Sequence, residues 1–442
     1  MNPMSYSIYA LGLFILFLFS EDALAEELPA AGGHLTLQEA IEIALSHHPT
    51  LLAARGALQV RQARVGEARA NLFPQLELQS VYTRATSNFA PNPQFRGLTQ
   101  TMVSESNTSF NNYSASLSLQ QRIFDFGKTN AEVESARENL QGSSWDAETS
   151  LQAVVVNVKV AYFGLLEARH LVRVNEETVR QFGQHLEQTQ GFYQAGTRTR
   201  FDITKAEVDL TNARLELIRA RNAEDVARIT LANAIGVPDQ PIGELEELLN
   251  FKKVEISEDQ AIEDALKNRP ELLSLSAQRR AAEASVRSAK RNHFPVLSGV
   301  ADYTYRGQDF PLVWNWDVGL NLTFPIFSGY LTQSQIAEAR ANLLVVGANE
   351  EAFRQNVILE IHQAFSNLRE AEERVQTSDV VVRQAEENFN LADGRFQAGV
   401  GTSVERTDAQ VLLTNAKTSQ IQALYDYRVA EARLLKAMGR GE

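Results

Sequence analysis

The sequence contains no cysteine. Without a thiol, the chain cannot form a disulfide, a thiolate metal site, a thiol-based catalytic centre or a lipidated N-terminal cysteine. The histidine pair His47-His48 has no acidic partner at ligand spacing, so it indicates an exposed helix end, and we expect no metal and no cofactor. A nucleophile motif, a phosphate-binding loop and a catalytic dyad are also missing. We therefore predict that the protein is not an enzyme.

A surplus of positive charge is missing too. The sequence has 42 lysines and arginines and 55 aspartates and glutamates, so its formal net charge is −13. An acidic chain repels the phosphates of nucleic acid. We therefore expect no nucleic-acid partner.

Long hydrophobic runs are confined to the N-terminus. The segment Ile8–Phe19 is apolar, and Ala23-Leu24-Ala25 fits a small-x-small cleavage site, which together predict a signal peptide over residues 1–25. No Lys or Arg precedes Ile8, which leaves an uncleaved anchor as the alternative. Beyond this segment no run of about twenty apolar residues occurs, so we expect no transmembrane helix in the mature chain.

Proline is absent after Pro325, which removes the usual helix breaker from the last part of the chain. In its place runs a seam of small and apolar residues spaced alternately by four and three, from Val357 to Phe396. An average period of 3.5 is typical of a helix in a coiled coil. After a break at residues 397–403 the seam resumes at Ala409. The pattern predicts a long antiparallel helical hairpin over residues 330–438, about 100 Å in length at 1.5 Å per residue.

The same hairpin occurs earlier in the chain, at an offset of 203 residues. The segment Tyr193-Gln194-Ala195-Gly196 matches Phe396-Gln397-Ala398-Gly399, and Leu119 matches Leu322. Nearer the start of each half the offset is 221, as in Phe73-Pro74 and Phe294-Pro295. The chain is therefore a tandem duplication. We expect a first repeat at residues 26–236 with a hairpin at 129–235, a connector at 237–258, and a second repeat at 259–442.

Each repeat also carries two segments that alternate between apolar and polar residues, the pattern of a β-strand with two different faces. We expect strands at about 76–84, 113–123, 296–305 and 314–324. Each is long enough to cross a bilayer as a tilted strand. The aromatic residues on the apolar face would form an interfacial girdle: Tyr82, Tyr113, Tyr303, Tyr305, Trp314 and Trp316.

Four strands cannot close a barrel alone. A small soluble sheet is the alternative, but the flanking helices are too long to fold over it as a core. The polar segment Arg84–Asn112 between the first two strands is longer than its counterpart Arg306–Leu312, and such loops belong on the extracellular side of outer-membrane barrels. The fold class that we predict is an α+β membrane protein with an internal tandem repeat.

In the order and spacing of these elements the chain resembles the TolC family of outer-membrane efflux proteins, or outer-membrane factors. The resemblance covers the duplicated halves, the Phe-Pro step into each first strand, the segments Ile123–Gly127 and Ile326–Tyr330, and the aromatic-x-x-Gly hairpin tips. It implies a homotrimer with a twelve-stranded β-barrel in the outer membrane and a coiled-coil tunnel through the periplasm. The tunnel would dock to a periplasmic adaptor and to an inner-membrane pump of the RND, ABC or MFS type.

The family also implies roles for residues at the hairpin tips. Acidic residues six and nine positions after the second tip glycine line the periplasmic entrance in the family. Here these positions are Glu405 and Asp408, and Asp202 holds the first of them in the first repeat. A ring of carboxylates would favour cations; the alternative role of each is to cap a helix.

The chain departs from the family at the gate. An Arg two residues after the second tip glycine, and a Tyr at the aromatic position, are common there, and this chain has Gly401 and Phe396. The first repeat keeps Tyr193 and Arg198, so we expect Arg198 or Arg200 to form any closing ion pair. The adaptor would bind the small residues of the tips: Ala195, Gly196, Thr197, Ala398, Gly399 and Val400.

The resemblance implies passive conduction of substrates from the pump to the exterior. Two alternatives remain open at this point: the outer-membrane component of a type I protein secretion system, and a coiled-coil structural or tethering protein of the periplasm. Detergent dependence separates the tether from the barrel. The substrate would be set by the pump and the adaptor.

Overall fold

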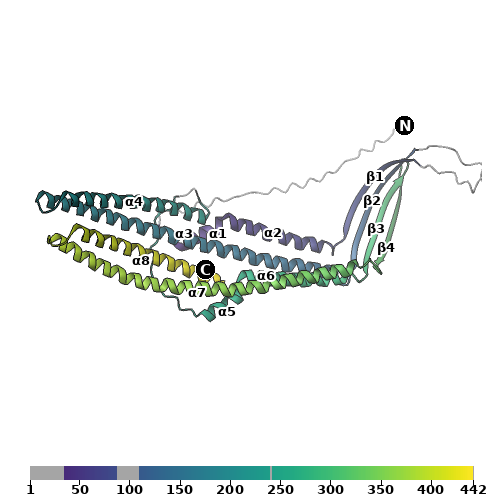
Figure 1. Ribbon diagram of the computed structural model, residues 1–442. Coiled ribbons are helices and arrows are strands. Elements are labelled where there is room, and N and C mark those ends of the chain that lie inside the picture. Colours follow the sequence, from purple (N-terminus) through teal and green to yellow (C-terminus); the bar gives the residue numbers. More distant parts are fainter. Residues whose placement is uncertain (1–33, 87–108, 239–240, 442) are drawn as a thin grey trace, which may run out of the picture.

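The computed structural model describes residues 34–86, 109–238 and 241–441. The molecule is a long rod of helices with a small sheet at one end and two helical hairpin tips at the other (Figure 1). The signal peptide expected at residues 1–25 lies outside the described residues. So do residues 87–108, the middle of the loop expected between the first two strands.

Eight helices make up the rod in the part of the chain that the structure describes. They are α1 (Leu37–His47), α2 (Pro49–Ala70), α3 (Lys128–Gln194), α4 (Arg200–Ile235), α5 (Glu258–Asn268), α6 (Pro270–Arg291), α7 (Leu331–Gln397) and α8 (Ser403–Ala437). The ends of α3 and α7 differ by 203 residues, and those of α2 and α6 by 221. The helix boundaries therefore confirm the tandem repeat.

The two longest helices, α3 and α7, contain 67 residues each, which corresponds to about 100 Å. They run the whole length of the rod, with α4 and α8 beside their tip halves and α2 and α6 toward the sheet (Figure 1). Both end at a glycine with a left-handed backbone, Gly196 and Gly399, as Schellman-type helix ends require.

One described helix is long and apolar enough to cross a membrane by length and composition, and this is α3. The apolar runs of the sequence predicted no such helix. Half of the apolar stretch is buried inside the chain. Val158, Leu165 and Leu166 are at most 1% exposed, packed against α1, α4 and residues after α4. This packing is that of a core helix in the wall of the rod.

Four antiparallel strands form one sheet in the order β1-β2-β3-β4. They are β1 (Gln75–Thr86), β2 (Ser109–Phe124), β3 (Val296–Gly307) and β4 (Val313–Thr323). The register places Leu78, Leu117, Tyr303 and Trp316 side by side on one face. All eleven residues of β4 are exposed. The apolar face therefore has no second layer against it, unlike the small soluble sheet considered above.

The first hairpin of the sheet extends farther than the alternation indicated. Thr83–Thr86 pair with Ser109–Asn112, so both strands continue into the segment expected to be loop. Side chains reinforce the extension, because Tyr82 donates to Asn111 at 3.1 Å and Arg84 to Ser109 at 3.0 Å. Polar residues still pair through the backbone, whereas the prediction followed the apolar alternation alone.

The segment after α4 packs against the rod. Leu245 is 6% exposed and forms a parallel bridge with Leu35. The Tyr162 hydroxyl donates to the Leu35 carbonyl at 2.8 Å, and that of Tyr427 to the Lys252 carbonyl at 2.6 Å. We call α1, α5, Leu35 and residues 241–257 the belt, because they pack against the middle of the rod, on α3 and α4 in the first repeat and on α7 and α8 in the second.

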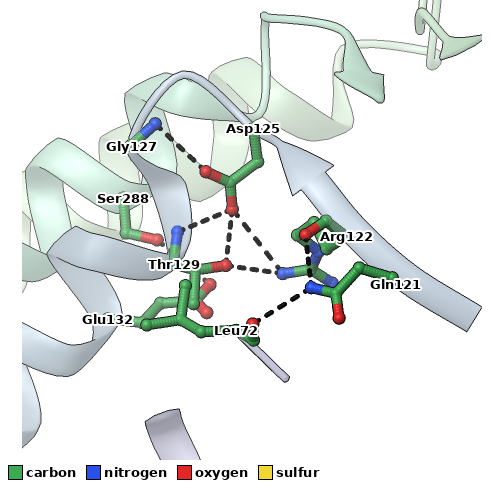
Figure 2. Close-up of polar contacts among 8 residues, drawn as sticks. All are labelled: Leu72, Gln121, Arg122, Asp125, Gly127, Thr129, Glu132 and Ser288. Atoms are coloured by element: carbon green, nitrogen blue, oxygen red, sulfur yellow. Dashed lines mark hydrogen bonds and ion pairs between the residues drawn. The ribbon is translucent and has the colours of Figure 1, made fainter. Parts of the chain in front are cut away.

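A polar corner fixes the step from β2 into α3 (Figure 2). The Asp125 carboxylate accepts from the Thr129 amide at 2.8 Å and the Gly127 amide at 3.1 Å, and Arg122 lies 3.7 Å away. Burial alone would raise the pKa of Asp125, but these hydrogen bonds and Arg122 outweigh it and lower the pKa. The second repeat makes the same turn, with positive φ at Gly329 and Tyr330.

Candidate functional site

The apolar face of the sheet is one candidate functional surface. Its aromatic residues gather at the end away from the helices, where Tyr82 contacts Tyr113 at 5.0 Å and Tyr303 contacts Trp314 at 6.2 Å between ring centroids. Below them lies a band of exposed aliphatic residues: Leu76, Leu78, Leu117, Leu119, Val318, Leu320 and Leu322. An aromatic edge on an aliphatic band matches the outer surface of a membrane barrel.

The opposite face of the sheet is polar. The register aligns Glu77, Ser118, Asp302 and Asp317 in a single row across the four strands. The Ser118 hydroxyl donates to the Asp302 carboxylate. In a closed barrel this row would form an acidic level of the lumen. No local sequence pattern indicates this row, because only the strand register brings the three carboxylates to one height.

The hairpin tips are the second candidate site. The six residues expected to bind an adaptor all lie exposed at the turns, with Val400 at 71%. A left-handed glycine follows the last helical turn in both tips, and the amides of Thr197 and Val400 close the turns on carbonyls five residues back, at 2.9 and 3.1 Å. The two tips thus present the same backbone shape.

The expected acidic residues differ in their surroundings. Asp202 caps α4: its carboxylate accepts from the Thr199 amide at 3.0 Å and the Thr199 hydroxyl at 2.8 Å. Burial would raise its pKa, but the bonds from Thr199 and the nearby Arg198 lower it. Glu405 lies 3.7 Å from Arg395, with both side chains half exposed or more, and Asp408 is exposed.

The two aromatic tip residues lie in opposite surroundings. Tyr193 is 44% exposed, whereas Phe396 is completely buried between the hairpins. The Phe396 ring packs edge-on against His185 at 4.9 Å and lies 4.8 Å from the Arg198 guanidinium. Within one chain, Phe396 is thus a packing residue of the contact between hairpins, not part of an exposed entrance.

Arg198 forms no ion pair with a carboxylate of the described chain. Its guanidinium donates to the Gly401 carbonyl at 2.7 Å. A Cβ at Gly401 would lie 2.9 Å from the Phe396 amide nitrogen, closer than packing allows. At this position, where the family often has Arg, the chain therefore requires glycine, because any Cβ would clash with the backbone at the end of α7.

His185 completes this contact. It is fully buried, and its Nε2 lies 2.9 Å from the Ser403 hydroxyl. Burial, and then the positive charge of Arg406, lower the pKa of His185 to about 4, against the opposing effect of Asp209 and Asp393. We call His185, Arg198, Phe396, Gly401 and Ser403 the tip junction, because they join α3 and the first tip to α7, the second tip and α8.

Further polar contacts extend the tip junction along the hairpins. The Thr407 hydroxyl donates to the Asp209 carboxylate at 3.1 Å, and the hydroxyls of Thr178 and Thr414 are hydrogen-bonded at 3.1 Å. Arg406, only 4% exposed, forms an ion pair with Asp393 at 2.5 Å. His185 and Arg406 were not among the predicted site residues, because the partner of His185 comes from the other hairpin and that of Arg406 from across the turn. A histidine between two apolar seam positions, Phe182 and Leu186, was the available signal.

The described residues contain no group of three or more His, Asp or Glu side chains placed to hold a metal ion. The grooves between the helices are open and are lined by mixed polar and apolar side chains.

Comparisons with known proteins agree with this arrangement. The sequence matches the family model described as outer membrane efflux protein over residues 40–237 and 261–440. The outer membrane protein TolC of Escherichia coli is 25% identical over 395 residues, which cover 85% of this chain and 76% of TolC. The toluene efflux pump outer membrane protein TtgC of Pseudomonas putida is 23% identical, covering 92% of this chain and 83% of TtgC.

A solved structure shares the fold. The CmeC outer membrane channel of Campylobacter jejuni superposes with a TM-score of 0.79 at 19% sequence identity, over 92% of this chain and 86% of CmeC. The α+β class and the internal repeat predicted from the sequence are confirmed.

Proposed function

Because the chain belongs to the outer membrane efflux protein family, we propose that it is the outer-membrane exit duct of a tripartite efflux system. It would conduct substrates passively from a periplasmic adaptor and an inner-membrane pump to the exterior. The proteins that it resembles are channels, not enzymes. The protein is placed in the outer membrane, with its helices in the periplasm.

The observation that carries the proposal is the exposed apolar face of an unclosed sheet. Side chains such as Leu78 (75% exposed) and Leu320 (73%) would face water if the sheet stood alone. Strands β1 and β4 each have one unpaired edge. Three copies of the sheet, joined edge to edge, would close a twelve-stranded barrel and place the apolar face against lipid.

The helices also have two unpartnered sides, in agreement with a homotrimer. Apolar residues are exposed along α4 on one side of the rod: Phe201, Val208, Leu215, Ile218, Val226 and Ile229. Others are exposed along α7 on the opposite side: Leu344, Val345, Leu359, Val380, Val381 and Leu391. Packing α4 of one copy on α7 of the next forms a closed ring of head-to-tail contacts.

The tips would then form the periplasmic end of the duct. We propose that Ala195–Thr197 and Ala398–Val400 bind the adaptor, and that Glu405 and Asp408 face the entrance. Asp202 would act there chiefly as a helix cap. An RND, ABC or MFS pump would set the substrate. Tyr82, Tyr113, Tyr303, Tyr305, Trp314 and Trp316 would form the outer girdle.

Adjacent residues of β4 give a direct test. The chain has no cysteine, so single introduced thiols report without background. In intact trimers in lipid, a Leu320→Cys thiol in the aliphatic band should resist a membrane-impermeant maleimide, and an Asn321→Cys thiol should react through the lumen. Equal labelling of both thiols would contradict the barrel. Detergent-solubilised unfolded protein, in which both must react, is the control.

A further inference from the structure

A groove of about 600 Å³ lies directly below the sheet, between the end of α2 and the first turns of α3. Its lining residues are Arg69, Leu72, Phe73, Asn130, Val133, Glu134 and Arg137. Leu72 and Phe73 are 42% and 63% exposed, and strand β1 begins two residues after Phe73. The groove therefore lies at the level where the membrane-facing band ends.

The groove carries an excess of positive charge. Arg69 and Arg137 form no ion pair or hydrogen bond through their side chains with another described residue. The one carboxylate of the lining, Glu134, is already paired with Arg287 of α6 at 2.8 Å. Two guanidiniums are thus left without an anion beside exposed apolar side chains.

The second repeat keeps the same pair of cations. At the offsets of the two repeats, Lys290 corresponds to Arg69 and Arg340 to Arg137, while Ala337 replaces Glu134. Lys290 and Arg340 also have no ion-pair partner among the described residues. Although the neighbouring residues differ, the cation pair recurs at the end of α6 and the start of α7.

Helix electrostatics account for only half of this pattern. Arg69 and Lys290 are the penultimate residues of α2 and α6, where a positive charge complements the helix dipole. Arg137 and Arg340 are each the tenth residue of a helix of 67 residues. The helix dipole does not stabilise a cation that far from the helix C-terminus, so these arginines require another explanation.

The groove opens on the belt side of α3. Asn130 and Arg137 occupy the same heptad position as Val158 and Leu165, which pack in one cluster with α1 and Leu245 of the belt. Three copies of the belt inside a tunnel would obstruct it, so the belt marks the outer surface. This step rests on the proposed function. The groove thus faces the periplasmic leaflet of the outer membrane, not the lumen.

From this placement we propose that the groove, and the corresponding cation pair Lys290 and Arg340, bind the phosphate of an anionic phospholipid from the periplasmic leaflet. Paired cations suit a phosphate, and guanidiniums bind it through two parallel hydrogen bonds. Leu72 and Phe73 would contact the start of the acyl chains. Basic pockets at the membrane surface recognise anionic headgroups in this way.

The test is native mass spectrometry of the purified, delipidated trimer with added phosphatidylglycerol or phosphatidylcholine. Six cation pairs, two in each of three chains, should retain phosphatidylglycerol in preference. In the variant Arg69→Gln/Arg137→Gln/Lys290→Gln/Arg340→Gln the affinity for phosphatidylglycerol should fall roughly 30-fold, which is the effect of two basic side chains per site. Phosphatidylcholine binding should not change.

A matched control removes charge elsewhere. Arg214 and Arg383 are exposed on the tip halves of α4 and α7. The double variant Arg214→Gln/Arg383→Gln should bind both lipids as the wild type does. Its matched counterpart is the double variant Arg69→Gln/Arg137→Gln, which removes the same number of charges from the groove.

Several outcomes would overturn the inference. Equal binding of the two lipids would leave only apolar contact, and displacement by millimolar inorganic phosphate would indicate a free-anion site. Dissociation of the fourfold variant's trimers in either lipid would place the cations in contacts between protomers. Failure of the wild type to form trimers would instead refute the proposed function.

Discussion

At the scale of single residues, His185 makes the tip junction sensitive to pH. In the junction the imidazole is neutral, because burial lowers its pKa to about 4. Once the hairpins part, water restores the ordinary pKa of about 6.5. The separated state therefore binds a proton that the junction does not bind. The stability that the junction gains from neutral His185 is complete above pH 6.5 and is lost as the pH falls toward 4.

We expect acid to open the tips. At pH 5.5 separation should be favoured about tenfold per protomer relative to pH 7.5, because the pH is one unit below the free pKa. Open probability in planar bilayers measures this. His185→Gln, which keeps a hydrogen-bonding side chain, should flatten the pH profile between 7.5 and 5.5. An unchanged profile in that variant would contradict the assignment of the response to His185.

Gly401 offers a second prediction at this scale. A Cβ there would meet backbone atoms of Phe396 and Arg395 at 2.9–3.0 Å, and backbone cannot yield as a flexible side chain can. Gly401→Ala should therefore destabilise the second tip by about 1–3 kcal/mol. Faster amide hydrogen exchange at residues 396–402 would show it. Gly394→Ala is the control, since nothing lies within 4 Å of its Cβ; equal exchange in both variants would contradict the steric account.

At the scale of elements, the corner at Asp125 sets the direction in which α3 leaves the sheet. Asp125→Ala would leave the amides of Gly127 and Thr129 without their acceptor, at a cost of about 1–3 kcal/mol. It would also remove the ion pair with Arg122, which would keep its bond to the Thr129 hydroxyl. The trimer should consequently dissociate at a lower temperature on semi-native gels.

The second repeat provides the matched control for that prediction. Ser328 occupies the position of Asp125 and makes only a 3.4 Å contact with Thr332. Ser328→Ala should thus lower the dissociation temperature much less than Asp125→Ala. If the two changes have equal effects, the carboxylate is not what holds the corner.

Much of the fold could be predicted at this scale. The 3.5-residue seam, the absence of proline after Pro325 and the repeat offsets indicated the long helices, and strand alternation gave the apolar face of the sheet. The outer ends of β1 and β2 were not predicted, because polar residues there pair through the backbone as well as apolar ones do. The tip junction was missed because His185 and Ser403 are 218 residues apart, and no local pattern reports such a contact.

At the scale of the whole molecule, two acidic levels would act on a permeating ion in the proposed trimer. One is formed by Glu405 and Asp408 at the tips, and the other by Glu77, Asp302 and Asp317 in the sheet. Carboxylates that line a pore favour cations. Glu405→Ala/Asp408→Ala should lower the cation preference measured by reversal potential. Asp302→Asn/Asp317→Asn should lower it separately.

Combining the two pairs of substitutions tests whether the levels are independent. If they are, the fourfold variant should lose more cation preference than either double variant. Unchanged selectivity in Glu405→Ala/Asp408→Ala would contradict the proposal that these two carboxylates line the entrance.

The central claim is that several copies of the chain close one barrel through a membrane. The most direct measurement is the mass of the detergent-purified protein, together with its conductance after reconstitution into a planar bilayer. The account predicts a homotrimer that needs detergent and gives discrete conductance steps. A monomer that stays soluble without detergent and gives no conductance would contradict it.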